Sequence, residues 1–158
     1  MAADGFSASI NAFTSQNYGA KNYNRVKQGY KTGMFVVGLW GLLTTAILIF
    51  LPGPIFSCFI HETNILPYGI DYLIILGYSQ LFMCIEIATQ GAFNGLGKTL
   101  PPSIVSIVFT SARIPMAILL SNYLGVNGVW WAISISSMIK GIVLVTWFIF
   151  YSKRRLIA

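Results

Sequence analysis

The chain has 158 residues, of which 56% are hydrophobic and only 9% are charged, and its formal net charge is +6. Soluble domains carry about 25% charged residues, so this composition excludes an ordinary water-facing surface and indicates a protein of the lipid bilayer. The lysines and arginines are not gathered in one patch. We therefore expect no nucleic-acid partner and interpret these cations as topology signals.

The first segment, residues 1–18, is polar, and we expect it to form a helix. At helical spacing Asp4 and Asn11 fall on one face, and Phe6 and Ile10 fall on another. A helix lying on the membrane surface is the alternative, but such helices usually carry lysine or arginine, and none precedes Lys21. Eighteen helical residues rise only about 27 Å. We interpret the segment as the end of a cavity-lining span whose beginning is missing or just covered.

Four longer apolar runs follow, and each is close to the ~20 residues that a membrane-spanning helix needs. They are too long and too continuously apolar for the strands of a membrane barrel, which alternate over about 10 residues. We therefore expect an all-α polytopic membrane protein with about five transmembrane helices, in one membrane domain over residues 1–158. The expected helices cover residues 1–18, 31–51, 69–94, 103–121 and 128–151.

The connectors between these helices alternate in charge. Residues 14–31 are interpreted as a polar, basic connector, whereas residues 52–71 and 122–127 contain no lysine or arginine. The basic residues are Lys21, Arg25, Lys27 and Lys31 before the first clear span, Lys98 after the second, and Lys153, Arg154 and Arg155 at the end. Because cytoplasmic connectors carry an excess of cations, we expect the basic connectors and the C-terminus to be cytoplasmic.

Three charged residues, Glu86, Arg113 and Lys140, lie inside the apolar runs. On insertion scales each charge costs about 2.5–3.5 kcal/mol at the bilayer centre, so such groups face a bundle interior or water and usually pair. One interpretation is a cation or proton site at Glu86, with Arg113 or Lys140 as its intramembrane charge partner. The alternative is an ion pair that only locks helices together, or a long side chain that reaches the membrane surface.

Glu86 belongs to a polar stripe on its expected helix, which points toward a cavity or a neighbouring helix rather than toward lipid. The stripe consists of Ser79, Glu86, Thr89, Gln90 and Asn94. The candidate residues of a cation-coupling or substrate cavity are Glu86, Gln90, Asn94, Asp4 and Asn11.

The sequence offers no constellation for catalysis. The single histidine, His61, lies in a connector expected to be external, and Cys58 and Cys84 match neither a metal-site spacing nor a disulfide framework. We therefore expect no enzyme activity, no catalytic residue, no metal ion and no cofactor other than a coupling ion.

Four motifs resemble those of a known transporter family. Residues 5–21, GFSASINAFTSQNYGAK, look like its GxS…QNxGAG stretch, and residues 90–101, QGAFNGLGKTLP, are similar to its GALRGxGxTxxP turn. Arg113-Ile-Pro followed by residues 124–130, LGVNGVW, resembles RIP…LGLxGVW, and Lys140 stands where the last helix often has a basic residue. Over essentially its whole length the chain therefore resembles the multidrug and toxic compound extrusion (MATE) transporters.

This resemblance implies part of the C-terminal six-helix bundle of a twelve-helix transporter, from within helix eight to helix twelve. The chain would then be a fragment of a multi-pass protein of a bacterial or archaeal plasma membrane, and its partner would be the missing N-terminal half. The implied function is secondary active transport, in which drugs or other small organic cations are exported in exchange for Na⁺ or H⁺. The expectation is that the fragment alone does not transport.

The chain departs from the family pattern at several positions. Asn94 stands where arginine is usual, and Lys98 stands where aspartate is common. Met83 aligns with the acidic residue of the tenth helix in some members, and Glu86 lies one turn later on the same face. A coupling role for Glu86 is therefore supported by helical geometry and not by register.

Two other functions stay open at this point. A lipid-linked oligosaccharide flippase of the same superfamily would need a larger and more cationic cavity, with Arg113 and Lys140 both facing it. A non-transporting membrane subunit would co-purify with a second membrane protein and would show no ion-dependent binding of a substrate.

Overall fold

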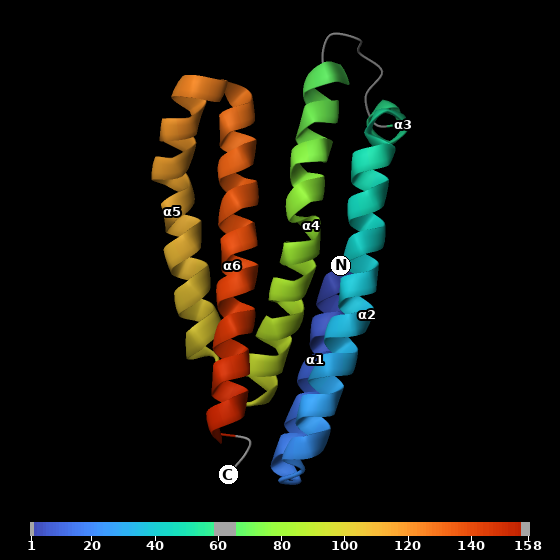
Figure 1. Ribbon diagram of the computed structural model, residues 1–158, viewed down its shortest axis with the longest axis vertical. Coiled ribbons are helices and arrows are strands. Elements are labelled where there is room, and N and C mark those ends of the chain that lie inside the picture. Colours follow the sequence, from blue (N-terminus) through green and yellow to red (C-terminus); the bar gives the residue numbers. More distant parts are fainter. Residues whose placement is uncertain (1, 59–65, 156–158) are drawn as a thin grey trace.

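The structure is a computed structural model that describes residues 2–58 and 66–155, and within these ranges it contains helices and no strand. Its helices are α1 (Ala2–Gly19), α2 (Tyr23–Phe50), α3 (Pro52–Ser57), α4 (Leu66–Gly95), α5 (Leu100–Leu124) and α6 (Val126–Arg155) (Figure 1). The all-α fold expected from the sequence is confirmed.

Helix α4 is the central element of the bundle. It contacts α1 and α2 on one side and α6 on the other, while α5 packs mainly against α6. Figure 1 shows α5 and α6 as a hairpin beside α4, with α2 and α3 on the opposite side and α1 beside the lower half of α2. The buried side chains of α4 are therefore divided between two different groups of helices.

Four of the helices, α2, α4, α5 and α6, are long and apolar enough to cross a membrane. They correspond to the four apolar runs of the sequence, so the prediction of these four spans is confirmed by length and composition. Helix α1 has 18 residues and is not among the four. Its N-terminal end lies at mid-height of the bundle in Figure 1.

Helix α2 begins well before the expected position. The turn after α1 contains only residues 20–22, so Arg25, Lys27 and Lys31 lie in the first turns of a helix and not in a connector. The side chain of Asn22 caps this helix by accepting a hydrogen bond from the backbone N–H of Arg25 at 3.4 Å. The polar residues that suggested a connector are thus the part of α2 that extends past its apolar section.

Two other connectors are shorter than expected. Residues 52–57 form the short helix α3, because proline is tolerated in the first turn of a helix. Helices α5 and α6 are separated by Gly125 alone, whose φ of +58° favours glycine. His61, which was expected in the external connector, lies outside the described residues.

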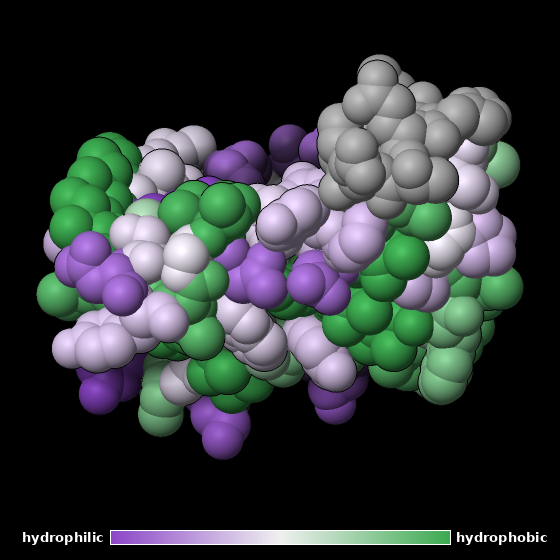
Figure 2. Space-filling view, turned by 90° about the horizontal axis from the view of Figure 1, so that it is seen from above, coloured by the Kyte–Doolittle hydropathy of each residue, from purple (hydrophilic) through white to green (hydrophobic). Residues whose placement is uncertain are grey.

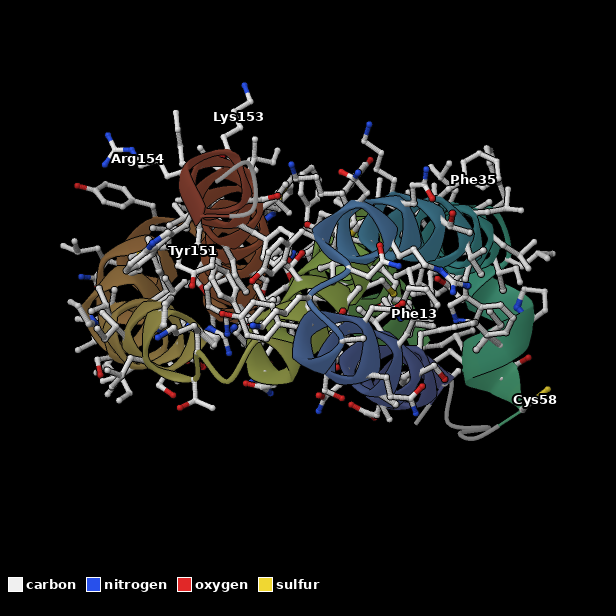
Figure 3. The ribbon with its side chains drawn as sticks, turned by 90° about the horizontal axis from the view of Figure 1, so that it is seen from below. Phe13, Phe35, Cys58, Tyr151, Lys153 and Arg154 are labelled. Carbon is white, nitrogen blue, oxygen red and sulfur yellow. The ribbon has the colours of Figure 1, made fainter. Side chains whose placement is uncertain are left out.

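The cationic ends of the helices gather at one end of the bundle. In Figure 1 the α1–α2 turn with Lys21, the α4–α5 turn with Lys98, and the last turn of α6 all lie at the lower end. The α5–α6 turn at Gly125 lies at the upper end. Figure 3, which looks from below, shows Lys153 and Arg154 pointing away from the helices. The structure therefore has the alternation of basic and non-basic ends that the sequence predicted.

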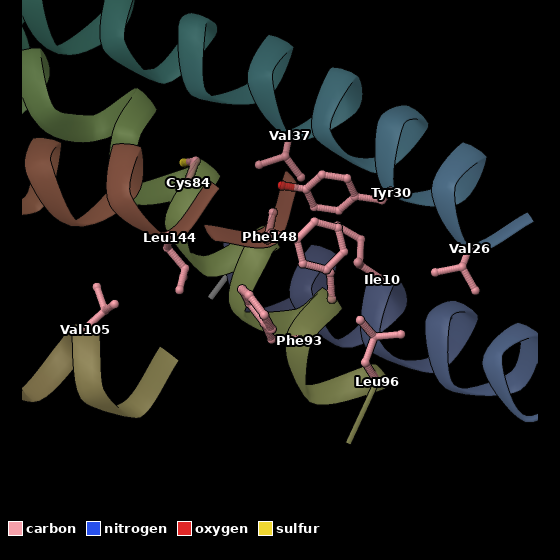
Figure 4. Packing of buried hydrophobic residues seen from close by; sticks show 12 residues of the cluster. Ile10, Val26, Tyr30, Val37, Cys84, Phe93, Leu96, Val105, Leu144 and Phe148 are labelled. Carbon is pink, nitrogen blue, oxygen red and sulfur yellow. The ribbon is translucent and has the colours of Figure 1, made fainter. Parts of the chain in front are cut away.

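The core lies around α4, where it packs against α1 and α2 on one side and α6 on the other, and aromatic rings fill its centre (Figure 4). The ring of Phe148 in α6 lies 4.1 Å from that of Tyr30 and 5.1 Å from that of Phe93, measured between centroids. Outside this core, large apolar side chains such as Phe35 and Phe50 are exposed. Figure 2, which looks onto the upper end of the bundle, shows polar and hydrophobic side chains mixed there, with hydrophobic ones toward the edges. Large exposed apolar side chains along the helices are expected of a protein surrounded by lipid.

Two glycines allow α1 and α4 to pack closely. A side chain at Gly91 would place its Cβ 2.4 Å from the backbone oxygen of Ser7, and one at Gly95 would place it 2.7 Å from that of Asn11. Small residues four positions apart permit such close approach between membrane helices. The contact fixes the face of α4 that meets α1, and that face determines which residues can share a site.

Candidate functional site

A buried ion pair joins the second half of α4 to the middle of α6. The Lys140 ammonium lies 2.9 Å from the Glu86 carboxylate, and the two side chains are only 9% and 13% exposed, respectively. Both charges belong to helices that are long and apolar enough to span a membrane. Of the two partners expected for Glu86, the structure therefore selects Lys140.

Arg113 is not a partner of Glu86. It lies on α5 and reaches α6, where its Nε donates a hydrogen bond to Ser136 Oγ at 2.6 Å and its Nη2 donates one to Ser137 Oγ at 2.9 Å. The sequence prediction did not include these two serines. The sequence does contain a sign of them, a cluster of serines within an apolar run, Ser134-Ile-Ser-Ser137. Because an unpaired hydroxyl group is unfavourable in lipid, such a cluster indicates hydrogen bonds to a neighbouring helix.

The polar stripe of α4 is divided between two neighbouring helices. Toward α6, Ser79 Oγ donates to Ser134 Oγ at 3.3 Å, and Ser134 Oγ donates to the carbonyl oxygen of Ile75 at 2.8 Å. Toward α2, the hydroxyl groups of Tyr30 and Thr89 lie 3.1 Å apart. Ser79 and Thr89 therefore hold helices together and do not line one common cavity.

The remaining candidates of the stripe, Gln90 and Asn94, lie further along α4 than Glu86. Gln90 is exposed and Asn94 is half-buried. Four residues of an α-helix complete slightly more than one turn, so Gln90 lies roughly one turn below Glu86 on a similar face. Glu86 and Gln90 therefore share one side of α4, and Gln90 is open to whatever lies outside the described helices.

The structure does not bring Asp4 and Asn11 to Glu86. Helix α1 packs on the face of α4 that contains Gly91 and Gly95. Nine residues at about 100° each place Glu86 about 180° around the helix from Gly95. Asp4 is exposed and Asn11 is half-buried, so the five candidates expected to line one cavity are divided between two sides of α4.

The sequence comparisons identify relatives over most of the chain. A family model described as MatE matches residues 1–119. The "Probable multidrug resistance protein NorM" of Thermotoga maritima is 31% identical over 134 residues, which cover 82% of this chain and 29% of that protein. The "Probable multidrug resistance protein YoeA" of Bacillus subtilis is 26% identical over 133 residues, with the same two coverages. The chain thus spans less than a third of the length of these curated relatives.

Solved structures share the fold. An inward-facing conformation of a multidrug resistance MATE family transporter of the MOP superfamily superposes with a TM-score of 0.83 at 22% identity, covering 95% of this chain and 34% of that one. An outward-facing conformation of such a transporter gives a TM-score of 0.79 at 23% identity, with the same coverages. At these identities the similarity shows the fold alone.

These comparisons decide between several of the expectations from the sequence. Proteins of this family are membrane transporters and not enzymes, as the absence of a catalytic constellation in the sequence predicted. The flippase alternative is not favoured, because the matching family model and the curated relatives are those of multidrug transporters. With a family model that matches three quarters of its length, the chain belongs to the MatE family of multidrug transporters.

Proposed function

We propose that the chain forms part of a secondary active transporter that exports drugs or small organic cations in exchange for Na⁺ or H⁺ by alternating access. The observation that carries the proposal is the ion pair between Glu86 and Lys140, buried between two apolar helices. Charged groups within membrane spans are rare and commonly mark ion or substrate pathways. The rest of the transporter would be the partner of this chain.

The ion pair couples the binding of a cation to the packing of α4 against α6. While Glu86 is ionised, its charge compensates that of Lys140 across 2.9 Å. When the carboxylate takes up a proton or binds Na⁺, that compensation is lost, and an uncompensated buried charge costs several kcal/mol. The bound cation therefore favours an arrangement of the two helices in which Lys140 reaches water or another partner.

Exchange follows if the coupling ion and the substrate compete for one carboxylate. An organic cation that binds the carboxylate of Glu86 displaces a proton or Na⁺, because this single negative charge cannot compensate two bound cations at once. Gln90, exposed about one turn further along α4, is positioned to donate hydrogen bonds to a solute near that carboxylate. Glu86 would then bind the two cations in turn, as antiport requires.

The orientation of the chain is part of the same proposal. The end of the bundle that carries Lys21, Lys98 and Lys153 would lie in the cytoplasm, together with the C-terminus, because positive charge is retained on that side of a membrane. The substrate pathway would then lead away from this basic end.

The experiment is an efflux measurement on a transporter of the relatives' length that contains this chain, with Glu86→Gln as the variant. We expect efflux to fall at least about ten-fold, as for the loss of an interaction of about 1.4 kcal/mol, and the remaining efflux to lose its dependence on pH or on Na⁺. Loss of the pH dependence would identify H⁺ as the coupling ion, and loss of the Na⁺ dependence would identify Na⁺. Labelling at Lys98 or Lys153 by a reagent that does not cross membranes tests the orientation.

Asp71→Asn is the matched control, because it removes one carboxylate from an exposed position at the opposite end of the bundle. It should leave both the efflux rate and its ion dependence unchanged. A Glu86→Gln protein that is inserted normally and keeps the rate and the ion dependence of the wild type would remove Glu86 from the coupling role.

A further inference from the structure

A groove of about 300 Å³ lies between α2 and α6 near the basic end of the bundle, apart from the Glu86–Lys140 pair. Its rim carries three lysines and its floor is aromatic. It is lined by Lys27, Tyr30, Lys31, Phe148, Ile149 and Lys153, with Ser152 beside them. This combination of concentrated positive charge and apolar surface is not explained by the proposed transport site.

The floor of the groove is apolar and packed into the core. The rings of Tyr30 and Phe148 lie 4.1 Å apart and are almost fully buried (Figure 4). The hydroxyl group of Tyr30 is already engaged with Thr89 inside the bundle. The floor therefore presents carbon atoms to an occupant, and it suits a hydrocarbon segment better than a polar one.

The lysines of the rim have no acidic partner in the part of the chain that the structure describes. The four acidic residues of the sequence are Asp4, Glu62, Asp71 and Glu86. Glu86 pairs with Lys140, and Asp71 lies at the first turns of α4, at the other end of the bundle. Lys27, Lys31 and Lys153 therefore leave three positive charges beside one groove without a carboxylate to balance them, and an anion near them is favoured.

Helices α2 and α6, which line the groove, also expose large apolar side chains to their surroundings. Phe35 of α2 is 74% exposed and Phe150 of α6 is 60% exposed. Lysines at the end of an apolar span lie at the level of the lipid headgroups. An occupant of the groove would thus meet hydrocarbon along the helices and positive charge at their ends.

We propose that this groove is a binding site for an anionic phospholipid. The headgroup phosphate lies among Lys27, Lys31 and Lys153, and an acyl chain runs along Phe148 and Ile149. Basic pockets between membrane helices bind anionic headgroups by this combination of charge and apolar contact. The apolar floor favours a lipid over a free phosphate ion, which would gain nothing from Tyr30 and Phe148.

The test uses the full chain in nanodiscs of equal parts phosphatidylglycerol and phosphatidylcholine. After mild delipidation, native mass spectrometry gives the ratio of the two lipids that stay bound. In the triple variant K27Q, K31Q and K153Q we expect the preference for phosphatidylglycerol to fall about ten-fold or more, since each lysine near an anionic lipid contributes several-fold. The matched control K21Q, R25Q and K98Q removes three exposed cations at the same end but outside the groove, and it should change the preference less than about two-fold.

Two further variants test whether the occupant of the groove is a lipid. Ile149→Trp narrows the groove without changing its charge and should lower phosphatidylglycerol binding, whereas replacing the three lysines by arginine should keep it. Equal losses in the two triple variants would overturn the proposal, because they would show a general attraction to the charged end. Displacement of bound phosphatidylglycerol by millimolar inorganic phosphate would also overturn it, in favour of a site for a soluble anion. Circular dichroism confirms that each variant keeps its helices.

Discussion

Lys140 and Arg113 both lie within apolar helices, yet the structure gives Lys140 a carboxylate at 2.9 Å and gives Arg113 two serine hydroxyl groups. The first arrangement cancels the charge, and the second only surrounds it with dipoles. A cancelled charge responds when its partner takes up a cation, whereas a charge held by neutral hydroxyls has no such partner. The two sites on α6 thus separate a charge that could couple to ion binding from one that joins helices.

The largest expected effect in this comparison comes from Glu86→Gln. The substitution leaves the Lys140 ammonium buried without a counter-charge, so we expect the free energy of unfolding to fall by about 3–5 kcal/mol. Reversible unfolding in mixed detergent micelles measures this change. The double variant Glu86→Gln with Lys140→Met should recover most of the loss, because no buried charge then remains. A loss below about 1 kcal/mol would mean that Lys140 reaches water, as an exposed pair would.

The overall fold could be predicted from the sequence because lipid leaves the backbone few alternatives. An apolar run of about 20 residues must form a helix, since its amide groups have no water to bond. The helix ends were less predictable. The first turns of α2 contain three cations and resemble a connector, but Asn22 caps a helix that continues beyond the apolar section. Polarity marks where lipid ends, and a helix can extend past that point.

The candidate site was predicted only in part, because helix spacing does not state which neighbour each face meets. The sequence indicated that Glu86 has a charged partner, but the choice between Arg113 and Lys140 depends on how α5 and α6 pack. It also grouped Asp4 with Glu86, although the glycines of α4 place α1 on the opposite face. Interpreting Gly91 and Gly95 as a helix-packing motif would have placed α1, with Asp4 and Asn11, on the side of α4 away from Glu86.

The second largest effect should come from removing both hydroxyl partners of Arg113. In the double variant Ser136→Ala with Ser137→Ala, the guanidinium loses two hydrogen bonds of the kind that contribute about 1.5–3 kcal/mol each when one partner is charged. Arg113 is only half-buried and can bond to water instead, so we expect a net loss of about 2 kcal/mol in the same unfolding assay. A loss as large as that of Glu86→Gln would contradict the distinction between the two cations.

A smaller effect is expected from Arg113→Lys, which keeps the charge and removes the fork of donors. One ammonium group cannot reach Ser136 and Ser137 with the geometry of Nε and Nη2. We expect the free energy of unfolding to be about 1 kcal/mol lower than in the wild type, which is the typical net contribution of one hydrogen bond. In the background that lacks both hydroxyls, the same substitution should have no further effect. An equal loss in both backgrounds would show that Arg113 acts through some other contact.

The smallest effect tests how far a hydroxyl contributes when no charge is present. Ser79 bonds to Ser134 across the α4–α6 contact at 3.3 Å, and Ser134 also donates to the Ile75 carbonyl at 2.8 Å. Ser79→Ala leaves that second bond in place, so we expect a loss near the average of about 0.6 kcal/mol for hydrogen bonds between membrane helices. A double-mutant cycle with Ser134→Ala isolates the pair. The coupling energy between Ser79 and Ser134 should be smaller than that between Arg113 and Ser136. If the two coupling energies were equal, the charge of Arg113 would not strengthen its hydrogen bonds. Charge would then matter on α6 only in the pair of Glu86 with Lys140.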